Sequence, residues 1–378
     1  MRNQNRTSQP KVHKELFQRL FAPADIQIDG NRPWDIKVHN DAFYSRVISQ
    51  RNLGLGESYM DGWLDCDSVD QLIEKVLQVD LGSSFTLKDL PSYLRALLTD
   101  HGSRMRSSNI AEKHYDIGND LFSVMLDKRL VYTCAYWDKA HDLDSAQEAK
   151  LDLVCKKLGL KAGQSVLDIG CGWGSFAKFA AEKYGVRVVG VTVSKEQVEL
   201  GNKLCAGLPV EIRLMDYRDV NEKFDHIVSL GMFEHVGAKH FRTYMKKAAE
   251  CLKDDGLFLL HTIGSNDSYG RTDKFLDKYI FPGGRLPLIE EIGKSIENIF
   301  IMEDWHNFGS DYGKTLMAWY ENFDKNWPQL REKYGERFYR MWKYYLLSCA
   351  GAFRSRKVPL WQIVLSKKGV QGGYKSVR

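Results

Sequence analysis

Seven short hydrophobic runs follow one another between residues 166 and 365, separated by more polar stretches. Continuous apolar and β-branched runs are typical of strands covered on both faces of a largely parallel sheet. After the first run, Phe176, Phe179 and Ala180 recur at the spacing of one helix face. The pattern predicts an α/β fold with a seven-stranded sheet. The predicted strands are 166–169, 186–192, 210–215, 224–230, 258–263, 299–302 and 359–365.

The first hundred residues follow a different pattern, which predicts a smaller and mainly helical domain. A helix is expected over 11–21, with an apolar face made of Leu16, Phe17, Leu20 and Phe21. Packing of this face into a core is preferred, and contact with a membrane surface is the alternative. Short strands are expected near 25–29 and 35–39, glycines that break a helix in 53–63, and helix over 68–98.

The polar composition of residues 101–110 predicts a linker between an N-terminal domain, 1–100, and a catalytic domain, 111–378. Two segments of the second domain, 114–122 and 132–137, mix aromatic and hydrogen-bonding residues without a helix or strand period. They are expected to line a site in front of the sheet, although aromatic packing alone explains them equally well.

The C-terminal part of the chain contains three further predicted segments. Residues 265–298 interrupt the sheet and suit a lid over a substrate. Helices are expected around 315–326 and 335–350, and their many aromatic side chains indicate a core rather than a ligand box.

The composition is ordinary for a globular protein of two domains: 378 residues, 43% of them hydrophobic and 27% charged. No stretch approaches the roughly 20 apolar residues of a membrane span, and the first residues lack the apolar core of a signal peptide. Seven cysteines, without a CxxC pair, fit a reduced cytoplasm and predict neither a disulfide framework nor a metal site.

The net charge of +5 is concentrated at the C-terminal end. Residues 354–378 contain seven Lys and Arg and no acidic residue. Such a cluster can contact phosphate on lipid or nucleic acid, or it can be a solvated tail around the last strand. The composition favours neither interpretation.

Three glycines at alternate positions, Gly170, Gly172 and Gly174, separate the first predicted strand from the helix that follows it. Glycines there let the backbone turn and let a nucleotide approach the main chain. A nicotinamide site needs an acidic residue about 20 positions further on, but Thr192 stands at 192 − 170 = 22 and no acid is near. With Asp168 just before the glycines, the pattern favours a class I methyltransferase that uses S-adenosylmethionine.

Other candidate residues follow later strands. Asp216 and Tyr217 end the third strand, where such enzymes usually contact adenine. Glu234 follows the fourth strand, at the sheet edge where open α/β sheets bind ligands, and His261 lies within the fifth. A lone histidine in an apolar strand is usually a core residue, but Glu234 at the end of the adjacent strand favours a functional site here.

Taken together, these motifs resemble the cyclopropane-fatty-acyl-phospholipid synthase family over nearly the whole chain. The most specific segments are 114–122, 132–137, 170–174, 231–237, 261–264 and 304–312. The resemblance implies a class I, Rossmann-like methyltransferase domain behind a smaller helical domain. It also implies a reaction, the addition of a methylene from S-adenosylmethionine across the cis double bond of a phospholipid acyl chain.

The family mechanism passes through a carbocation, which aromatic side chains in a dry pocket can stabilise. Bound bicarbonate is thought to remove the proton that lets the ring close. By resemblance, this anion is held by Cys134, Glu234, His261 and Tyr312, with the Ile263 backbone beside them. Cys349 matches a family cysteine once proposed as catalytic and ranks below this set. The implied cofactor contacts are Tyr132, Thr133, Asp168, Gly170, Gly172, Gly174, Thr192, Gln197, Asp216 and Tyr217.

The resemblance further implies a cytoplasmic homodimer, peripherally bound to the inner face of the membrane, that acts on the phospholipid bilayer surface. Three other functions stay open. One is a methyltransferase that makes a branched or oxygenated acyl chain, and another is a membrane-associated binding protein without catalysis. The third is nucleic-acid methylation, which is disfavoured because no recognition motif accompanies the basic tail.

Overall fold

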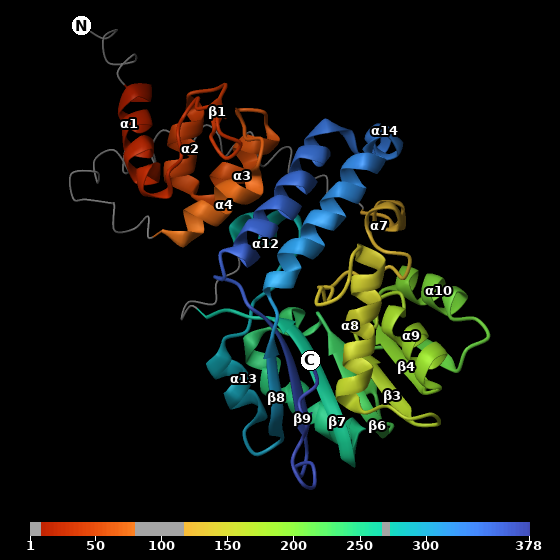
Figure 1. Cartoon of the computed structure of the whole chain (residues 1–378). Coiled ribbons are helices and arrows are strands. Elements are labelled where there is room, and N and C mark those ends of the chain that lie inside the picture. The colour runs from red at the N-terminus through yellow and green to blue at the C-terminus, as the bar shows by residue number, and fades with distance from the viewer. Residues whose placement is uncertain (1–8, 80–116, 267–272) are drawn as a thin grey trace, which may run out of the picture. The chain divides into compact units, whose positions relative to one another are not determined.

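A computed structural model describes residues 9–79, 117–266 and 273–378 (Figure 1). The chain divides into two compact units. The N-terminal unit extends to Met125 and also takes Asp273–Pro282 and Leu316–Ser355. The sheet unit consists of Leu126–Thr272, Gly283–Thr315 and Arg356–Arg378. The predicted linker at 101–110 lies outside the described residues, so the boundary between 1–100 and 111–378 stays a prediction.

The sheet unit is built on seven described strands in the order β5-β4-β3-β6-β7-β9-β8. The first five in this order are parallel, and β9 pairs antiparallel with both β7 and β8. This confirms the predicted α/β fold and its seven strands, although β8 begins and ends later than expected. The strands are β3 (Ser165–Ile169), β4 (Arg187–Thr192), β5 (Val210–Leu214), β6 (Phe224–Leu230), β7 (Leu252–Ile263), β8 (Ile301–Asn307) and β9 (Leu360–Ser366).

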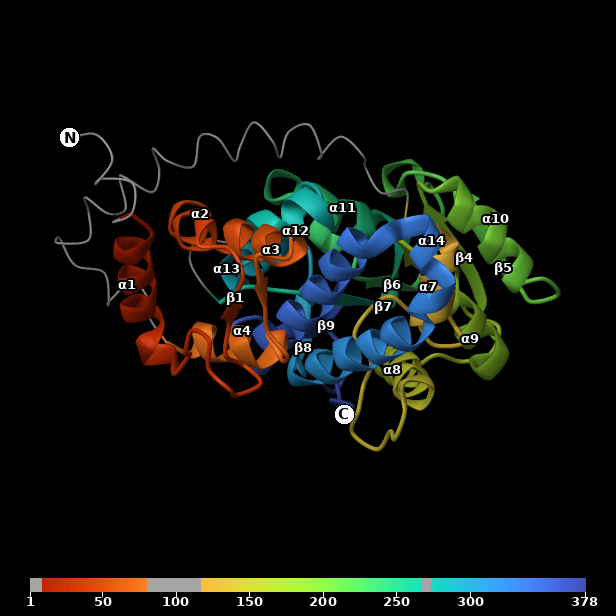
Figure 2. The same cartoon turned by 90° about the horizontal axis from the view of Figure 1, so that it is seen from above.

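Helices lie on both faces of the sheet (Figure 2), and side chains that alternate along a strand belong to two different core clusters. On β3, Val166 packs under α8 (Leu143–Leu158) and α9 (Ser175–Tyr184), while Leu167 belongs to the cluster on the opposite face. That second cluster contains residues of α11 (Phe241–Cys251) and α13 (Ile289–Ile296). α10 (Lys195–Leu204) covers the β4–β5 edge. Burial on both faces explains why these strands are apolar without a polar alternation.

The prediction of a lid over 265–298 is wrong for its C-terminal part. Ile292 and Ile296 of α13 are buried in the core cluster that covers one face of the sheet. Arg242 of α11 donates to the carbonyl oxygens of Lys294 and Glu297, 3.0 Å each, and so fixes the C-terminal end of α13. An amphipathic helix thus covers the sheet where part of a lid was expected.

The N-terminal unit is mainly helical, as predicted. Its described elements include α1 (Gln9–Phe21), α2 (Ala42–Gln50), α3 (Asn52–Met60), α4 (Val69–Gln78), α7 (Asn119–Met125) and α12 (Lys274–Tyr279), with the short strands β1 (Lys37–Val38) and β2 (Leu64–Asp65). Leu16 and Phe17 of α1 are buried, which confirms the core interpretation of this helix. Only β1 forms a strand in the two segments expected near 25–29 and 35–39, and residues 80–98 lie outside the described part of the chain.

Two segments of this unit are helical against expectation. Gly54 and Gly56 lie inside α3, because they serve close packing rather than a turn: a Cβ on Gly54 would lie 2.4 Å from the carbonyl oxygen of Arg46. A Cβ on Gly56 would lie 2.4 Å from the Phe275 ring. Gly62, with φ 70°, does lie in a turn, after the end of the helix. Residues 119–122, for which no helix was expected, begin α7, and 114–116 lie outside the described residues.

The two predicted C-terminal helices are continuous in α14 (Ser310–Arg354), except for a break at Gly335 with φ 75° and ψ 165°. Its first residues, up to Thr315, belong to the sheet unit and the remainder to the N-terminal unit. Most of its aromatic side chains are buried, which confirms that they form core. These buried aromatic residues include Trp319, Phe323, Phe338, Trp342, Tyr344 and Tyr345.

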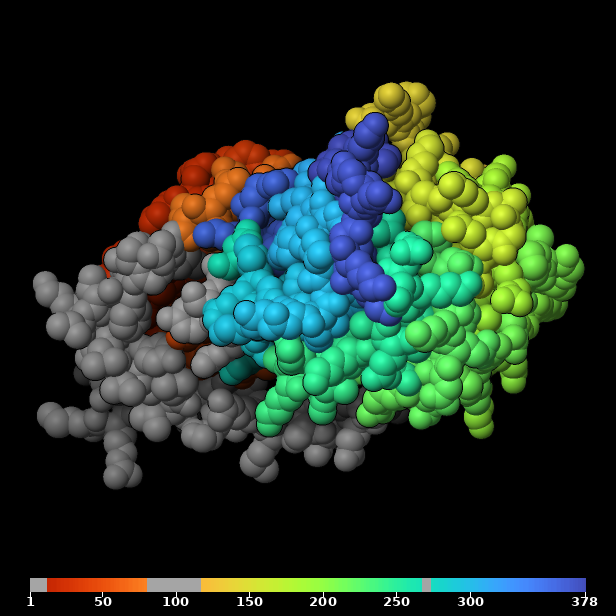
Figure 3. All heavy atoms as spheres, turned by 90° about the horizontal axis from the view of Figure 1, so that it is seen from below, coloured from red at the N-terminus to blue at the C-terminus, as the bar shows by residue number. Residues whose placement is uncertain are grey.

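Four of the seven basic residues in 354–378 have acidic partners in the structure. Lys367 and Lys368 both bind Asp254, and Arg378 binds Asp304. In the N-terminal unit, Arg354 binds Asp70 and Glu74. Figure 3 shows the C-terminal segment, in dark blue, on the surface beside β8. The cluster therefore acts as an anchor for the chain end, which weighs against a free phosphate-binding tail. Among the helices that the structure describes, none has the length and apolar character needed to cross a membrane.

Candidate functional site

The glycine loop leaves β3 at the carboxyl edge of the sheet. Gly170, Gly172 and Gly174 have φ values of 78°, 55° and 80°, a backbone region that costs other residues free energy. Gly170 N–H donates to the Val191 carbonyl at 3.0 Å, which ties the loop to the end of β4. A Cβ on Gly170 would lie 2.7 Å from the Met232 side chain. The loop is therefore held in a tight turn at the switch point of the sheet, where the strand order reverses between β3 and β6, as a nucleotide cradle requires.

The next strand ends carry the predicted polar residues. Thr192 ends β4, and its hydroxyl donates to the Gln197 side chain at 2.6 Å. Asp216 follows β5 and accepts two hydrogen bonds from the Arg218 guanidinium, which lowers the pKa of the Asp216 carboxyl. The ring of Tyr217 packs on Tyr244 of α11 with centroids 5.0 Å apart. The structure thus brings the predicted contacts from β3, β4 and β5 to one edge of the sheet.

The segment 132–137 is irregular, as predicted, and is held against α8. Lys150 of α8 is fully buried and donates to the Thr133 hydroxyl at 2.8 Å. Gln147, one turn earlier, donates to the Thr133 carbonyl at 2.8 Å. Burial lowers the pKa of Lys150 to about 8, and it raises the pKa of Asp168 on β3 to about 7 against the opposing effect of the Lys150 charge. Thr133 is therefore hydrogen-bonded to a buried lysine, and the charge of this lysine also acts on Asp168, in the strand before the glycine loop.

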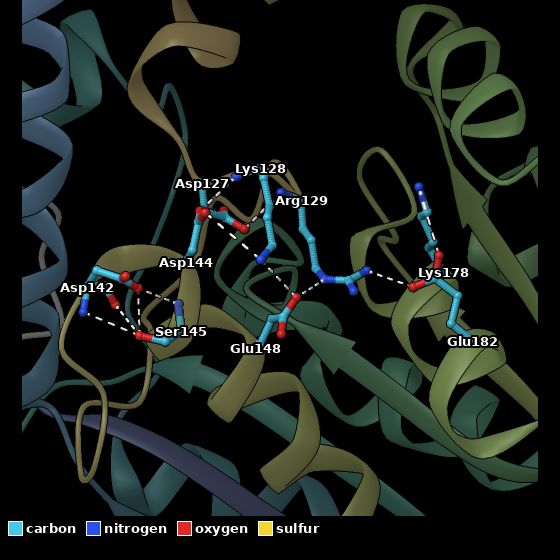
Figure 4. A network of polar contacts seen from close by, with 9 residues as sticks. All are labelled: Asp127, Lys128, Arg129, Asp142, Asp144, Ser145, Glu148, Lys178 and Glu182. Carbon is cyan, nitrogen blue, oxygen red and sulfur yellow. Dashed lines mark hydrogen bonds and ion pairs between the residues drawn. The ribbon is translucent and has the colours of Figure 1, made fainter.

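Ion pairs fix the loop that precedes this segment (Figure 4). Arg129 donates to Glu148 of α8 at 2.9 Å and to Glu182 of α9 at 3.0 Å. The Asp127 carboxylate accepts the backbone N–H groups of Arg129 and Val131 at 2.9 and 2.8 Å. The Arg129 contacts tie the loop before residues 132–137 to α8 and α9. The position of Thr133 is therefore also fixed by ion pairs a few residues earlier in the chain.

Glu234 lies in the turn after β6 and is buried. One carboxylate oxygen, Oε1, accepts the Ile263 backbone N–H at 2.7 Å, and Oε2 has no hydrogen-bond partner among the described residues. Burial raises the pKa of Glu234 to about 7, although the Ile263 N–H acts in the opposite direction. A buried carboxyl with one free oxygen and a pKa near neutrality is suited to receive a proton or to bind a donor.

His261 lies two residues before Ile263 on β7 and is almost fully buried. Its Nδ1 lies 3.3 Å from the amide nitrogen of Gln362, and its Nε2 has no hydrogen-bond partner in the described part of the chain. Burial and the charges of Lys150 and Lys157 hold the pKa of His261 well below its usual range. The imidazole is neutral, and one ring nitrogen is available to a ligand.

Cys134 and Tyr312 belong to the same unit as Glu234, His261 and Ile263. Cys134 is completely buried, and burial raises its pKa well above the usual value, so it is a thiol rather than a thiolate. Tyr312 lies buried in the first turn of α14. Cys349 belongs to the N-terminal unit, and burial raises its pKa to about 12, which makes it a poor nucleophile.

Three polar residues of this region were missed at the sequence level: Lys150, Lys157 and Gln362. The two lysines occupy the apolar stripe of α8, in line with Leu143, Ala146 and Val154, and both are fully buried. A charged residue at a core position of an amphipathic helix is the signal that could have revealed them. Within 9–79, 117–266 and 273–378, no group of His, Cys, Asp and Glu has the geometry of a metal site.

Comparisons with known proteins agree with this arrangement. The family model described as mycolic acid cyclopropane synthetase matches residues 102–363. The chain is 51% identical over 365 residues to a cyclopropane-fatty-acyl-phospholipid synthase of Escherichia coli (strain K12), a match that covers 96% of this chain and 95% of the relative.

Two solved structures extend the comparison to the fold. One is the cyclopropane synthase MmaA2 from Mycobacterium tuberculosis, with a TM-score of 0.63, 33% identity, and coverage of 67% of this chain and 96% of that one. The other is the mycolic acid cyclopropane synthase CmaA1 complexed with SAH and CTAB, with a TM-score of 0.63, 34% identity, and coverage of 68% and 97%.

Proposed function

The chain belongs to the mycolic acid cyclopropane synthetase family, and we propose that it transfers a methylene group from S-adenosylmethionine to the cis double bond of an unsaturated phospholipid acyl chain. One observation of the structure supports this reaction most directly. The carboxyl edge of the sheet joins a glycine loop to two buried groups, Glu234 and His261, that each keep one polar atom without a partner among the described residues.

The residues around the glycine loop fit S-adenosylmethionine. Gly170, Gly172 and Gly174 offer main chain without a Cβ, and Thr192 and Asp216 provide polar groups at the neighbouring strand ends. When bound, the sulfonium supplies an activated methyl group. The chain itself must orient this methyl toward a weak nucleophile and exclude water, which the burial of Cys134 and Ala135 promotes.

The donor set also fits a small anion such as bicarbonate. His261 Nε2 has no partner among the described residues, and Cys134 and Tyr312 are buried in the same unit, although the Cys134 thiol donates to the Ala135 carbonyl oxygen at 3.2 Å. The Ile263 N–H does not match the expectation fully, because it already binds Glu234 Oε1. When bound, bicarbonate would supply a base for the new methyl group. Glu234 would take up a proton at Oε2, since a pKa of about 7 leaves it ionised above neutrality and lets it accept one.

We further propose that the enzyme is a cytoplasmic homodimer that works at the inner face of the bilayer. The membrane location follows from the substrate, because acyl chains are available only at a lipid surface, and the dimer is proposed from the family resemblance. It is supported by the absence of a candidate membrane span in the described helices. Vesicle flotation with and without unsaturated phospholipid would test membrane binding, and sedimentation would test the dimer.

The reaction is tested by mixing the purified protein with S-adenosylmethionine and vesicles of an unsaturated phospholipid. Acyl chains heavier by one methylene, which resist hydrogenation as cyclopropanes do, are expected. A chain that gains a methyl and an oxygen, or a branched chain, would instead support the related methyltransferase reactions. Cofactor binding with unchanged lipid would overturn the proposal.

Replacing Lys150 by methionine is expected to weaken binding of S-adenosylmethionine roughly tenfold, because Thr133 loses a charged hydrogen-bond donor. Titration calorimetry with the cofactor measures the change. Lys157→Met is the matched control: Lys157 is equally buried on the same helix, but its Nζ lies 3.0 Å from His306 instead. An equal loss of affinity in both variants would contradict a specific role for Lys150.

A further inference from the structure

Gln362 lies directly opposite His261 in the sheet. The two residues face each other in the antiparallel register of β7 and β9, and both are completely or almost completely buried. The Gln362 amide nitrogen lies 3.3 Å from His261 Nδ1. On the other ring nitrogen, Nε2, no hydrogen-bond partner is found in the described residues. Every hydrogen bond that the described chain makes to this imidazole therefore comes from one glutamine.

The state of the imidazole follows from its surroundings. Lys150 and Lys157 both act on His261 from α8, and together with burial they disfavour the imidazolium form. A neutral imidazole carries hydrogen on only one ring nitrogen. The Gln362 amide is placed with its nitrogen, which can only donate, toward Nδ1, and its oxygen Oε1 has no partner among the described residues. In this orientation Nδ1 accepts and the ring hydrogen lies on Nε2.

We infer that Gln362 is a positioning residue that holds His261 as the Nε2–H tautomer, so that His261 presents a hydrogen-bond donor to the site. The role given to this tautomer rests on the proposed function, because an anion bound beside the Glu234 carboxylate needs a hydrogen-bond donor. The opposite tautomer would direct a lone pair at the anion and repel it. Gln362 acts through His261 and does not itself touch the reacting atoms.

Nitrogen NMR of the protein labelled with ¹⁵N-histidine tests the inference directly, because protonated and bare ring nitrogens have different shifts. The signals of His261 are identified by their loss in His261→Asn. We expect a protonated Nε2 and a bare Nδ1 at neutral pH. His226 is an internal reference, since its Nδ1 accepts the Leu257 backbone N–H at 3.3 Å and it must have the same tautomer.

Gln362→Leu is expected to release the tautomer, so that His261 shifts move toward the average of both forms while those of His226 stay unchanged. Turnover should fall roughly tenfold with little change in the KM for S-adenosylmethionine. Gln147→Leu is the matched control, because Gln147 is an equally buried glutamine that binds the Thr133 carbonyl. It should leave the His261 shifts unchanged and raise that KM instead.

The inference is overturned if wild-type His261 carries its hydrogen on Nδ1, or if Gln362→Leu leaves the His261 shifts as they were. The wild-type spectrum decides the first point even if the variant fails to fold. Because the spectrum needs no substrate, it also separates this inference from the proposed reaction. A protein that forms no cyclopropane but shows the Nε2–H tautomer would refute the reaction alone.

Discussion

Turnover of acyl chains is expected to fall by at least about 100-fold in Glu234→Gln, while S-adenosylmethionine still binds. The amide oxygen can keep the hydrogen bond from the Ile263 N–H, so the turn after β6 should hold its place. What is lost is the free carboxylate oxygen Oε2, with its charge and its ability to take a proton. Product analysis by mass spectrometry and cofactor titration on the same preparation measure both effects. Normal turnover would remove Glu234 from the site.

The same carboxyl predicts two pH dependences. Wild-type turnover should rise as pH increases through about 7, because the pKa of Glu234 is raised to about 7 and the carboxylate forms above it. Stability should change in the opposite direction. A group whose folded pKa is raised stabilises the fold fully below its ordinary pKa of 4.5, and this contribution is lost as pH rises through 7.

Glu234→Gln is the control for the direction of the stability change with pH, since glutamine does not titrate. The stability of the variant relative to the wild type should therefore improve between about pH 5 and pH 8. Urea unfolding at both pH values measures the difference. A relative stability that is independent of pH would show that the buried carboxyl does not titrate in this range.

The second large effect is expected for Gly174→Ala, which should lower the free energy of unfolding by about 2–5 kcal/mol and abolish cofactor binding. Two costs add at this position. Gly174 has φ 80°, a left-handed conformation that strains alanine, and the new Cβ would lie 2.5 Å from Ile212 Cδ1. Relief of this contact must displace the buried Ile212 side chain or shift the turn that forms the cradle.

Two other glycines separate these costs. Gly172 and Gly207 have φ 55° and 83°, and a Cβ on either meets no described atom within 4 Å. Gly207→Ala should therefore show the backbone cost alone, about 1–2 kcal/mol, without loss of cofactor affinity. Gly172→Ala should lower the free energy of unfolding by about as much as Gly207→Ala. It should still weaken cofactor binding, because Gly172 lies in the glycine loop. Urea midpoints and cofactor titration distinguish all three, and equal stability losses at Gly174 and Gly207 would contradict the contact with Ile212.

The sequence alone determined the strands, the glycine turn and the choice of cofactor class. These features depend on local patterns: apolar runs of strand length, glycines where φ is positive, and Thr192 where a nicotinamide site needs an acid. Prediction failed where a residue type has two uses. The glycines of α3 looked like helix breakers, but Gly54 and Gly56 allow close helix packing, and only the neighbours Arg46 and Phe275 reveal this.

Only the tertiary structure decided which polar atoms are left free for chemistry. Glu234 and Ile263 are 29 residues apart, and His261 and Gln362 are 101 apart, so no local pattern shows that one oxygen and one ring nitrogen are already occupied. The burial of Lys150 and Lys157 is likewise a property of the packed α8 face. The sequence therefore determined which groups the site contains. The packing of strands that are distant in the sequence decided the hydrogen-bond partners of these groups. These partners and the burial of the groups in turn set the pKa of Glu234 and the tautomer that we infer for His261.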